Sequence, residues 1–221
     1  MNVTKAVKSR RSIRSFTDKT PPADLIKGIL SKAVRAPSGG NLQPWHIVVL
    51  GGEKLTSLKE HMETRVLKGP DEPEYAIYPK NLAEPYRSRR YNVGEAMYSS
   101  IGIERENKLA RLQQLSQNFQ FFGAPIGLFL HTPKFMGPPQ WADLGMWLQT
   151  VMLLLREEGL DSCPQEAWAM YPDAVRKFVP IPDDHIMFCG MSIGYRDADA
   201  PINKFKAERA PVEENTTFIG L

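Results

Sequence analysis

Residues 141–155 are apolar around almost the whole circumference of the helix that they predict, and this feature constrains the fold most. A surface helix carries a polar face, so a helix without one must be buried on most sides. Gly159 is the kind of residue that ends such a helix. The chain therefore needs further layers around a central helix, and its 221 residues are enough to build them without disulfides.

Short β-branched or apolar runs predict the strands that surround this helix. These runs are residues 46–50 (a buried strand), 126–130, 160–163 and 185–193, with a last strand-like run at 216–219. Apolar spacing predicts further helices at residues 3–7, 25–34, 54–67, 93–118 (with a break near Gly102) and 173–179. Strands and helices do not alternate in a strict βαβ order, so the pattern favours the α+β class.

Composition excludes several classes of protein. The net charge of +3 is too small to indicate a nucleic-acid-binding protein by charge alone. The longest strongly apolar run, residues 151–155, is far shorter than the ~20 residues that cross a bilayer, and no signal peptide is visible. Two cysteines in apolar surroundings indicate a reducing compartment. We therefore expect a cytoplasmic protein that binds neither nucleic acid nor membrane.

Common catalytic and metal-binding motifs are missing from the sequence. The four histidines (His46, His61, His131 and His185) have no ligand spacing, so we expect no metal site. Neither a phosphate-binding glycine loop nor a Gly-x-Ser-x-Gly elbow is present. Asp183 and Asp184 are adjacent carboxylates that suit acid–base chemistry, although a solvated turn explains them better.

Two segments instead indicate an anion-binding site. Arg10, Arg11 and Arg14 crowd one short segment with Ser12, and such crowding is costly unless an anion or solvent compensates the charge. Residues 37–45 join a helix to a strand through small residues that let a ligand approach the backbone closely. A solvated basic surface and a plain loop are the alternatives for these two segments.

The motifs, taken together, resemble the FMN-dependent nitroreductase family, and bacterial nitrobenzoate or nitroaromatic reductases in particular. The resemblance rests on residues 10–14 (RRSIR), 36–45 (APSGGNLQPW), 123–125 (GAP), 161–166 (DSCPQE), 189–195 (CGMSIGY) and 208–211 (ERAP). Residues 86–90 (YRSRR) and 137–141 (GPPQW) match in more detail. These motifs span nearly the whole chain in the family's order.

The resemblance implies a nitroreductase-like fold with a mixed central sheet surrounded by helices. It also implies an intertwined homodimer in which residues 216–219 add a strand to the partner's sheet. Residues 1–221 would form a single FMN-binding domain, with a lid or interface excursion around residues 68–92. Each of the two FMN sites would be built from both chains.

The resemblance also assigns roles to individual residues. Arg10 and Arg209 would bind the FMN phosphate, with Arg11 and Ser12 beside them and Arg14 near the pyrimidine edge of the flavin. The other implied contacts come from two loops, the first on the partner or along the ring: Pro37, Ser38, Gly39, Asn41 and Gln43, then Pro164, Gln165 and Glu166, whose backbone would face flavin N5. Ala167 stands where some members have glycine, which leaves the geometry of the second loop open.

The implied activity is an NAD(P)H oxidoreductase that reduces nitroaromatics or quinones through FMN, with NADH or NADPH as donor and a small aromatic acceptor. The flavin carries the chemistry, so no catalytic side chain is predicted, and one flavin face serving both substrates predicts ping-pong kinetics. The alternatives are a same-fold reductive dehalogenase or ene-type reductase, and a non-catalytic flavin-binding protein. Arg87, Arg89 and Arg90 either attract an anionic substrate or only solubilise their loop.

Overall fold

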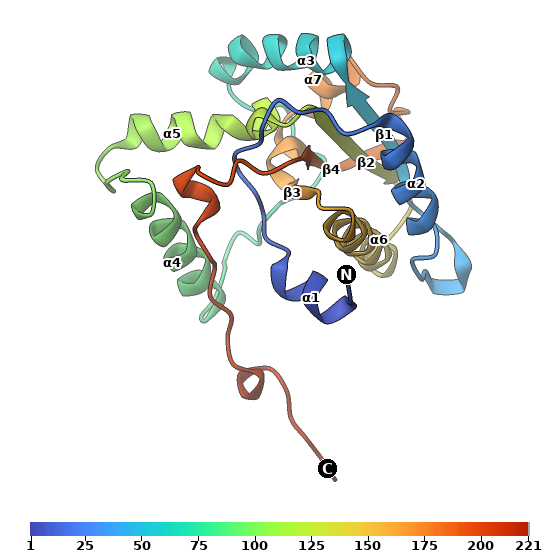
Figure 1. Cartoon of the computed structure of the whole chain (residues 1–221), viewed down its shortest axis with the longest axis vertical. Coiled ribbons are helices and arrows are strands. Elements are labelled where there is room, and N and C mark those ends of the chain that lie inside the picture. Colours follow the sequence, from blue (N-terminus) through green and yellow to red (C-terminus); the bar gives the residue numbers. More distant parts are fainter. Residues whose placement is uncertain (221) are drawn as a thin grey trace.

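The computed structural model describes residues 1–220 as helices on both faces of a four-stranded sheet (Figure 1). The strands are β1 (His46–Gly51), β2 (Ile126–Pro133), β3 (Asp161–Gln165) and β4 (His185–Gly194). The helices are α1 (Val3–Ser9), α2 (Ala23–Ala33), α3 (Gly52–Arg65), α4 (Tyr86–Ser99), α5 (Lys108–Ser116), α6 (Pro138–Glu157) and α7 (Pro172–Arg176).

The strand order in the sheet is β1-β2-β4-β3, and all neighbouring strands are antiparallel. An isolated parallel bridge between Ser12 and Ser162, outside the four-stranded antiparallel sheet, joins the N-terminal segment to β3. The central strands β2 and β4 are buried along almost their whole length. Both faces of these strands are therefore covered, which explains why their sequences are nearly continuous apolar runs.

Helix α6 packs with α2 on one face of the sheet (Figure 1). Trp147 and Val151 of α6 are fully buried, and Leu128 and Leu130 of β2 point to the same cluster. Side chains two residues apart share a sheet face, so this pair follows directly from strand geometry. The prediction of a buried central helix is confirmed.

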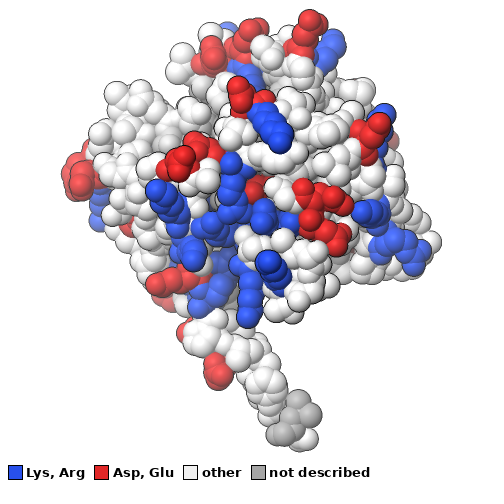
Figure 2. All heavy atoms as spheres, in the orientation of Figure 1, with Lys and Arg blue, Asp and Glu red and all other residues white. Residues whose placement is uncertain are grey.

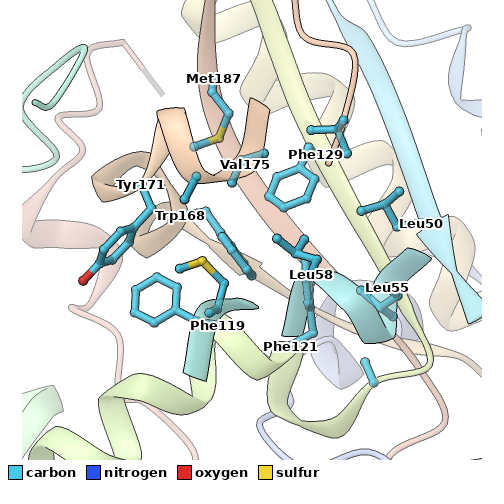
Figure 3. Close-up of a cluster of buried hydrophobic side chains, with 14 of the residues drawn as sticks. Leu50, Leu55, Leu58, Phe119, Phe121, Phe129, Trp168, Tyr171, Val175 and Met187 are labelled. Carbon is cyan, nitrogen blue, oxygen red and sulfur yellow. The ribbon is translucent and has the colours of Figure 1, made fainter. Parts of the chain in front are cut away.

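The opposite face is covered by α3, α7 and two 3₁₀ segments, Gln117–Gly123 and Glu166–Met170. Figure 3 shows Trp168 at the centre of this cluster, between Phe119, Phe121 and Phe129. Gly190 of β4 faces the indole, and a Cβ there would overlap the Trp168 ring. The glycine on the strand thus makes room for one of the two fully buried tryptophans.

Helices α4 and α5 lie to one side of the sheet and contribute no buried residue. The two helices are joined by a two-pronged ion pair, in which Arg111 Nη1 and Nη2 donate to the Glu95 carboxylate at 2.6 and 2.9 Å. The three leucines of α5, Leu109, Leu112 and Leu115, are exposed. The predicted break near Gly102 is confirmed, because the chain leaves the helix after Ser99 and re-enters one at Lys108.

Two predictions from the sequence need correction. Strand β1 is an edge strand in which Leu50 is the buried residue, so it is not a buried strand. Helix α4 begins at Tyr86, which places Arg87, Arg89 and Arg90 on a helix rather than in an irregular stretch. The strand expected at residues 216–219 would pair with a second chain; in this single chain these residues lie exposed at the end of an extended tail (Figure 1).

Three histidines converge at one end of the sheet, where β1 begins, β2 ends and β4 begins. The rings of His46, His131 and His185 lie 4.8 to 5.5 Å apart, centroid to centroid, and His131 Nδ1 is 2.8 Å from His185 Nδ1. Burial and the two neighbouring rings lower the pKa of His131 to about 4. The spacing of these histidines in the sequence gave no sign of this convergence.

No helix within residues 1–220 combines the length and the apolar character needed to cross a membrane.

Candidate functional site

A large cavity opens beside α4, with a volume of about 1740 Å³. Its walls come from α1 and the segment after it, from α4, from α6 and from residues 205–209 near the C-terminus. The basic lining residues are Lys8, Arg10, Arg11, Arg14, Lys80, Arg87, Arg90, Arg156, Arg196, Lys206 and Arg209. Glu95 is the one acidic lining residue in the described part of the chain. In Figure 2 the Lys and Arg side chains gather at the centre of this face, between α4 and α1.

The arginine segment is held in place by contacts with the sheet and with the C-terminal region. The Ile13 side chain is buried, and its N–H donates to Ser162 O on β3 at 3.1 Å. The Arg14 N–H donates to Asn203 Oδ1 at 2.8 Å, and Asn203 Nδ2 donates in turn to Ser15 O. Alternating residues of an extended segment point in opposite directions. Burying Ile13 therefore turns its neighbours Ser12 and Arg14 toward the cavity, which both line.

Four predicted arginines and a predicted serine meet in this cavity: Arg10, Arg11, Ser12, Arg14 and Arg209. Burial lowers the pKa of Arg10, and the nearby Arg209 lowers it further. Burial also lowers the pKa of Arg11, with Arg196 adding to the effect. Within residues 1–220 no carboxylate lies within ion-pair distance of these four arginines. The site therefore holds positive charge that an anionic ligand would neutralise.

A buried carboxylate below the cavity organises two arginines that the sequence did not single out. Arg196 Nε donates to Asp161 Oδ2 at 2.6 Å, and Arg156 Nη1 donates to Asp161 Oδ1 at 2.9 Å. Asp161 is 1% exposed, so its charge depends on these partners. Arg196 is 35 residues from Asp161 in the sequence, so no local motif reveals that it shares the carboxylate with Arg156.

The wall of the cavity that residues 78–83 and helix α4 form together (the α4 wall) carries a second group of cationic and aromatic side chains. The Arg90 guanidinium lies 4.2 Å from the centre of the Tyr78 ring, and both residues line the cavity. Arg87 Nε donates to Glu84 at 2.7 Å in an exposed pair. Arg89 instead pairs with Glu214 at 2.6 Å and does not line the cavity. The three arginines of this run thus have different environments.

The loop that carries Pro37, Ser38, Gly39, Asn41 and Gln43 does not reach the cavity of its own chain. It lies on the opposite side of the molecule from α4 (Figure 1). The loop is anchored on the core, because the Gly39 N–H is 3.3 Å from both carboxylate oxygens of buried Asp143 on α6. Asn41 and Gln43 adopt positive φ angles of 58° and 50°, which is uncommon for residues with a Cβ.

Pro164, Gln165 and Glu166 lie at the end of β3, next to the arginine segment but outside the cavity lining. Gln165 is buried and bridges two elements: its Nε2 donates to Asn118 O at 2.6 Å, and its Oε1 accepts from Ser192 Oγ at 2.7 Å. Asn118 lines the cavity, so Gln165 acts as a support behind the wall.

The lining suits a phosphate-bearing aromatic cofactor such as FMN. Arginine forks and a serine hydroxyl are donors that phosphate oxygens accept, and tyrosine rings offer faces for stacking. The volume exceeds the roughly 300–1,000 Å³ of an ordinary small-molecule pocket, so a second small molecule can enter beside the cofactor.

The chain is similar to a known protein family and to curated relatives. A model described as the Nitroreductase family matches residues 7–195. A 4-nitrobenzoate reductase of Pseudomonas putida is 35% identical over 215 residues, covering 97% of this chain and 94% of the relative.

Two solved structures match nearly the whole chain. An FMN- and NADPH-dependent nitroreductase, NfnB from Sphigopyxis sp. strain HMH, is 48% identical with a TM-score of 0.97, covering 100% of both chains. The FMN-dependent nitroreductase NfnB from Mycobacterium smegmatis, solved in complex with NADPH, is 28% identical with a TM-score of 0.94, covering 98% of this chain and 97% of that one.

Proposed function

Because the chain belongs to the nitroreductase family, we propose that it is an FMN-dependent oxidoreductase that passes hydride from NADPH or NADH to nitroaromatic acceptors. The observation that carries the proposal is the meeting of Arg10, Arg11, Arg14 and Arg209 in one cavity. Arg209 comes from the opposite end of the chain to the other three, so the fold is what brings it to them. The relatives named for FMN and NADPH support both molecules as ligands.

The bound flavin would supply the hydride chemistry, and the side chains of this protein would bind and orient it. Arg10 and Arg209 would hold the phosphate, with Arg11 and Ser12 beside them, and Arg14 would lie near the pyrimidine edge. Fixed cations beside a group that gains negative charge stabilise the product of hydride transfer. Glu166 would place its backbone N–H near flavin N5.

The proposal includes a homodimer in which residues 37–43 of one chain complete the cavity of the other. The support is that this loop is anchored on α6, is exposed, and lies away from its own cavity. The exposed tail around residues 216–219 would pair with the second chain's sheet. Sites shared between chains would make the dimer obligate.

A spectroscopic experiment on the purified protein tests the activity. We expect a yellow, FMN-containing protein that NADPH bleaches without oxygen and that 4-nitrobenzoate returns to yellow. Double-reciprocal plots with varied donor and acceptor should be parallel, because the two substrates use the flavin face in turn. Colour without bleaching would instead identify a flavin-binding protein without turnover.

Two further results would overturn parts of the proposal. A colourless protein that cannot be reconstituted with FMN would remove the cofactor assignment. A single chain with bound FMN in sedimentation at micromolar concentration would remove the shared site, although the activity could stand without it.

A further inference from the structure

The cavity holds more positive charge than one FMN phosphate can neutralise. Arg156 and Arg196 are paired with Asp161, and Arg87 with Glu84. The basic lining residues without a carboxylate partner in the described part of the chain are Lys8, Arg10, Arg11, Arg14, Lys80, Arg90, Lys206 and Arg209. A phosphate monoester carries about two negative charges at neutral pH. Charge therefore remains for a second anionic group.

The unpartnered residues Lys80 and Arg90 lie on the α4 wall rather than in the arginine segment. Arg87 lies on the same wall and has Glu84 as its partner. The pair of Arg87 with Glu84 is exposed on both sides, and such pairs contribute little and exchange readily for another anion. Arg90 packs over the Tyr78 ring, which orients the guanidinium plane and leaves its edge donors available. The wall thus combines cations with aromatic faces.

This combination selects a particular ligand chemistry. Tyr78, Tyr91 and Tyr98 line the cavity beside these cations, so a planar ring can stack while its anionic group meets Arg87 or Arg90. Two molecules of the proposed reaction present such a group: an aromatic acceptor with a carboxylate, and the 2′-phosphate of NADPH. The first carries its anionic group directly on the aromatic ring, and the second carries it on the ribose next to the adenine ring.

We infer that Lys80, Arg87 and Arg90 form a second anion-binding subsite, separate from the phosphate-binding arginines, which recognises an anionic oxygen group on the donor or on the aromatic acceptor. The inference rests on the proposed function and deepens it. It makes α4 the element that determines which substrates are preferred.

The test compares an Arg87→Gln/Arg90→Gln double variant with Arg89→Gln. Arg89 lies on the same helix but pairs with Glu214 outside the cavity, so it is a matched control. The FMN-loaded proteins are titrated with benzoate against benzamide, and with adenosine 2′-phosphate against adenosine, by calorimetry and flavin absorption. Turnover is compared for 4-nitrobenzoate against nitrobenzene, and for NADPH against NADH.

We expect the double variant to weaken binding of an anionic ligand by about tenfold or more, as loss of charge-assisted hydrogen bonds predicts, and neutral ligands by less than about twofold. The value of kcat/KM should fall in parallel for the anionic substrate alone. Loss confined to benzoate and 4-nitrobenzoate identifies the acceptor carboxylate; loss confined to adenosine 2′-phosphate and NADPH identifies the donor. Loss in both arms means that the two groups use the subsite in turn.

Equal losses for charged and neutral ligands, or a double variant that matches Arg89→Gln, would overturn the inference. If the double variant fails to fold, Lys80→Gln and the salt dependence of benzoate and adenosine 2′-phosphate binding to the unmodified protein replace it. The inference would also be overturned if Lys80→Gln left the binding of both ligands unchanged and added salt did not weaken their binding to the unmodified protein. A protein that retains no FMN or reduces no nitrobenzene with either donor would instead refute the proposed function.

Discussion

The sheet with α6 and the flank formed by α4 and α5 are built in opposite ways. Helix α6 buries Leu144, Trp147 and Val151 completely, whereas no residue of α4 or α5 is buried. The flank is held mainly by ion pairs such as Arg111–Glu95 and by stacked cations such as Arg90 on Tyr78. One region is stabilised by apolar burial, and the other by interactions that water and salt weaken.

This difference separates stability from function in the molecule. The core is complete within one chain, since both faces of β2 and β4 are covered. The flank supplies the α4 wall of the cavity and would gain contacts from a ligand or from a second chain. Elements that must respond to ligands are usually those with few buried apolar contacts.

The largest effect is expected where the core leaves no space. Gly190→Ala would place a methyl group against the Trp168 ring, which neighbouring Phe119 and Phe121 hold in position. We expect a loss of about 3 kcal/mol in the free energy of unfolding, at the upper end of the usual range for overpacking. Urea denaturation measures it.

Gly94→Ala on α4 is the matched control, because nothing lies within 4 Å of a Cβ there. Alanine also has the better helix propensity, so this variant should be neutral or stabilising. Equal losses at the two glycines would contradict the contrast between a tight core and an open flank.

Low pH should destabilise the folded chain through His131, one of the three histidines at the end of the sheet. The pKa of His131 is about 4 in the folded chain, against an ordinary value of 6.5, because burial and the neighbouring His185 and His46 disfavour its charged form. The unfolded chain therefore takes up this proton first as the pH falls. The stabilisation is complete above pH 6.5 and is lost between pH 6.5 and 4, at most about 3 kcal/mol.

The measurement is the pH dependence of unfolding for the unmodified protein and for His131→Asn, which does not titrate. The variant should have a shallower decline between pH 6.5 and 4 whatever its stability at pH 8. Identical slopes would mean that His131 keeps an ordinary pKa in the folded state.

The sequence predicted elements better than the contacts between them. The apolar pattern of residues 141–155 predicts a buried helix because helix periodicity is local, and the four strands were found for the same reason. The edge position of β1 and the convergence of His46, His131 and His185 depend on strand order and register, which have no local signal.

The same limit applies to the candidate site. Arg10, Arg11 and Arg14 are adjacent in sequence, so their clustering was visible without a structure. Asn203 and Arg196 reach the site through partners that are distant in the sequence, Arg14 and Asp161 respectively. The resemblance supplied Arg209, which no local pattern marks.

A moderate effect on ligand retention is expected in the cavity without loss of the core. Arg10→Ala or Arg209→Ala removes a charge-assisted contact to the proposed FMN phosphate, which is worth about 1.5–3 kcal/mol, or roughly 10- to 150-fold in the dissociation constant. Fluorescence titration of the apoprotein with FMN measures the change, and riboflavin, which lacks the phosphate, is the control ligand. Unchanged FMN affinity in both variants would refute the phosphate assignment.

The smallest effect on global stability, and the most direct comparison of the two regions, is expected from Arg111→Gln. This change breaks the ion pair that joins α5 to α4 but touches nothing buried. Hydrogen exchange should therefore accelerate in residues 86–99 and 108–116 and stay unchanged in β2 and β4, because the flank can open without the core. Lys108→Gln, on the same helix and without a carboxylate partner in the described part of the chain, should change neither region. Faster exchange in β2 and β4 together with the flank would mean that the two regions unfold as one unit, and the division between a self-sufficient core and a ligand-responsive wall would then fail.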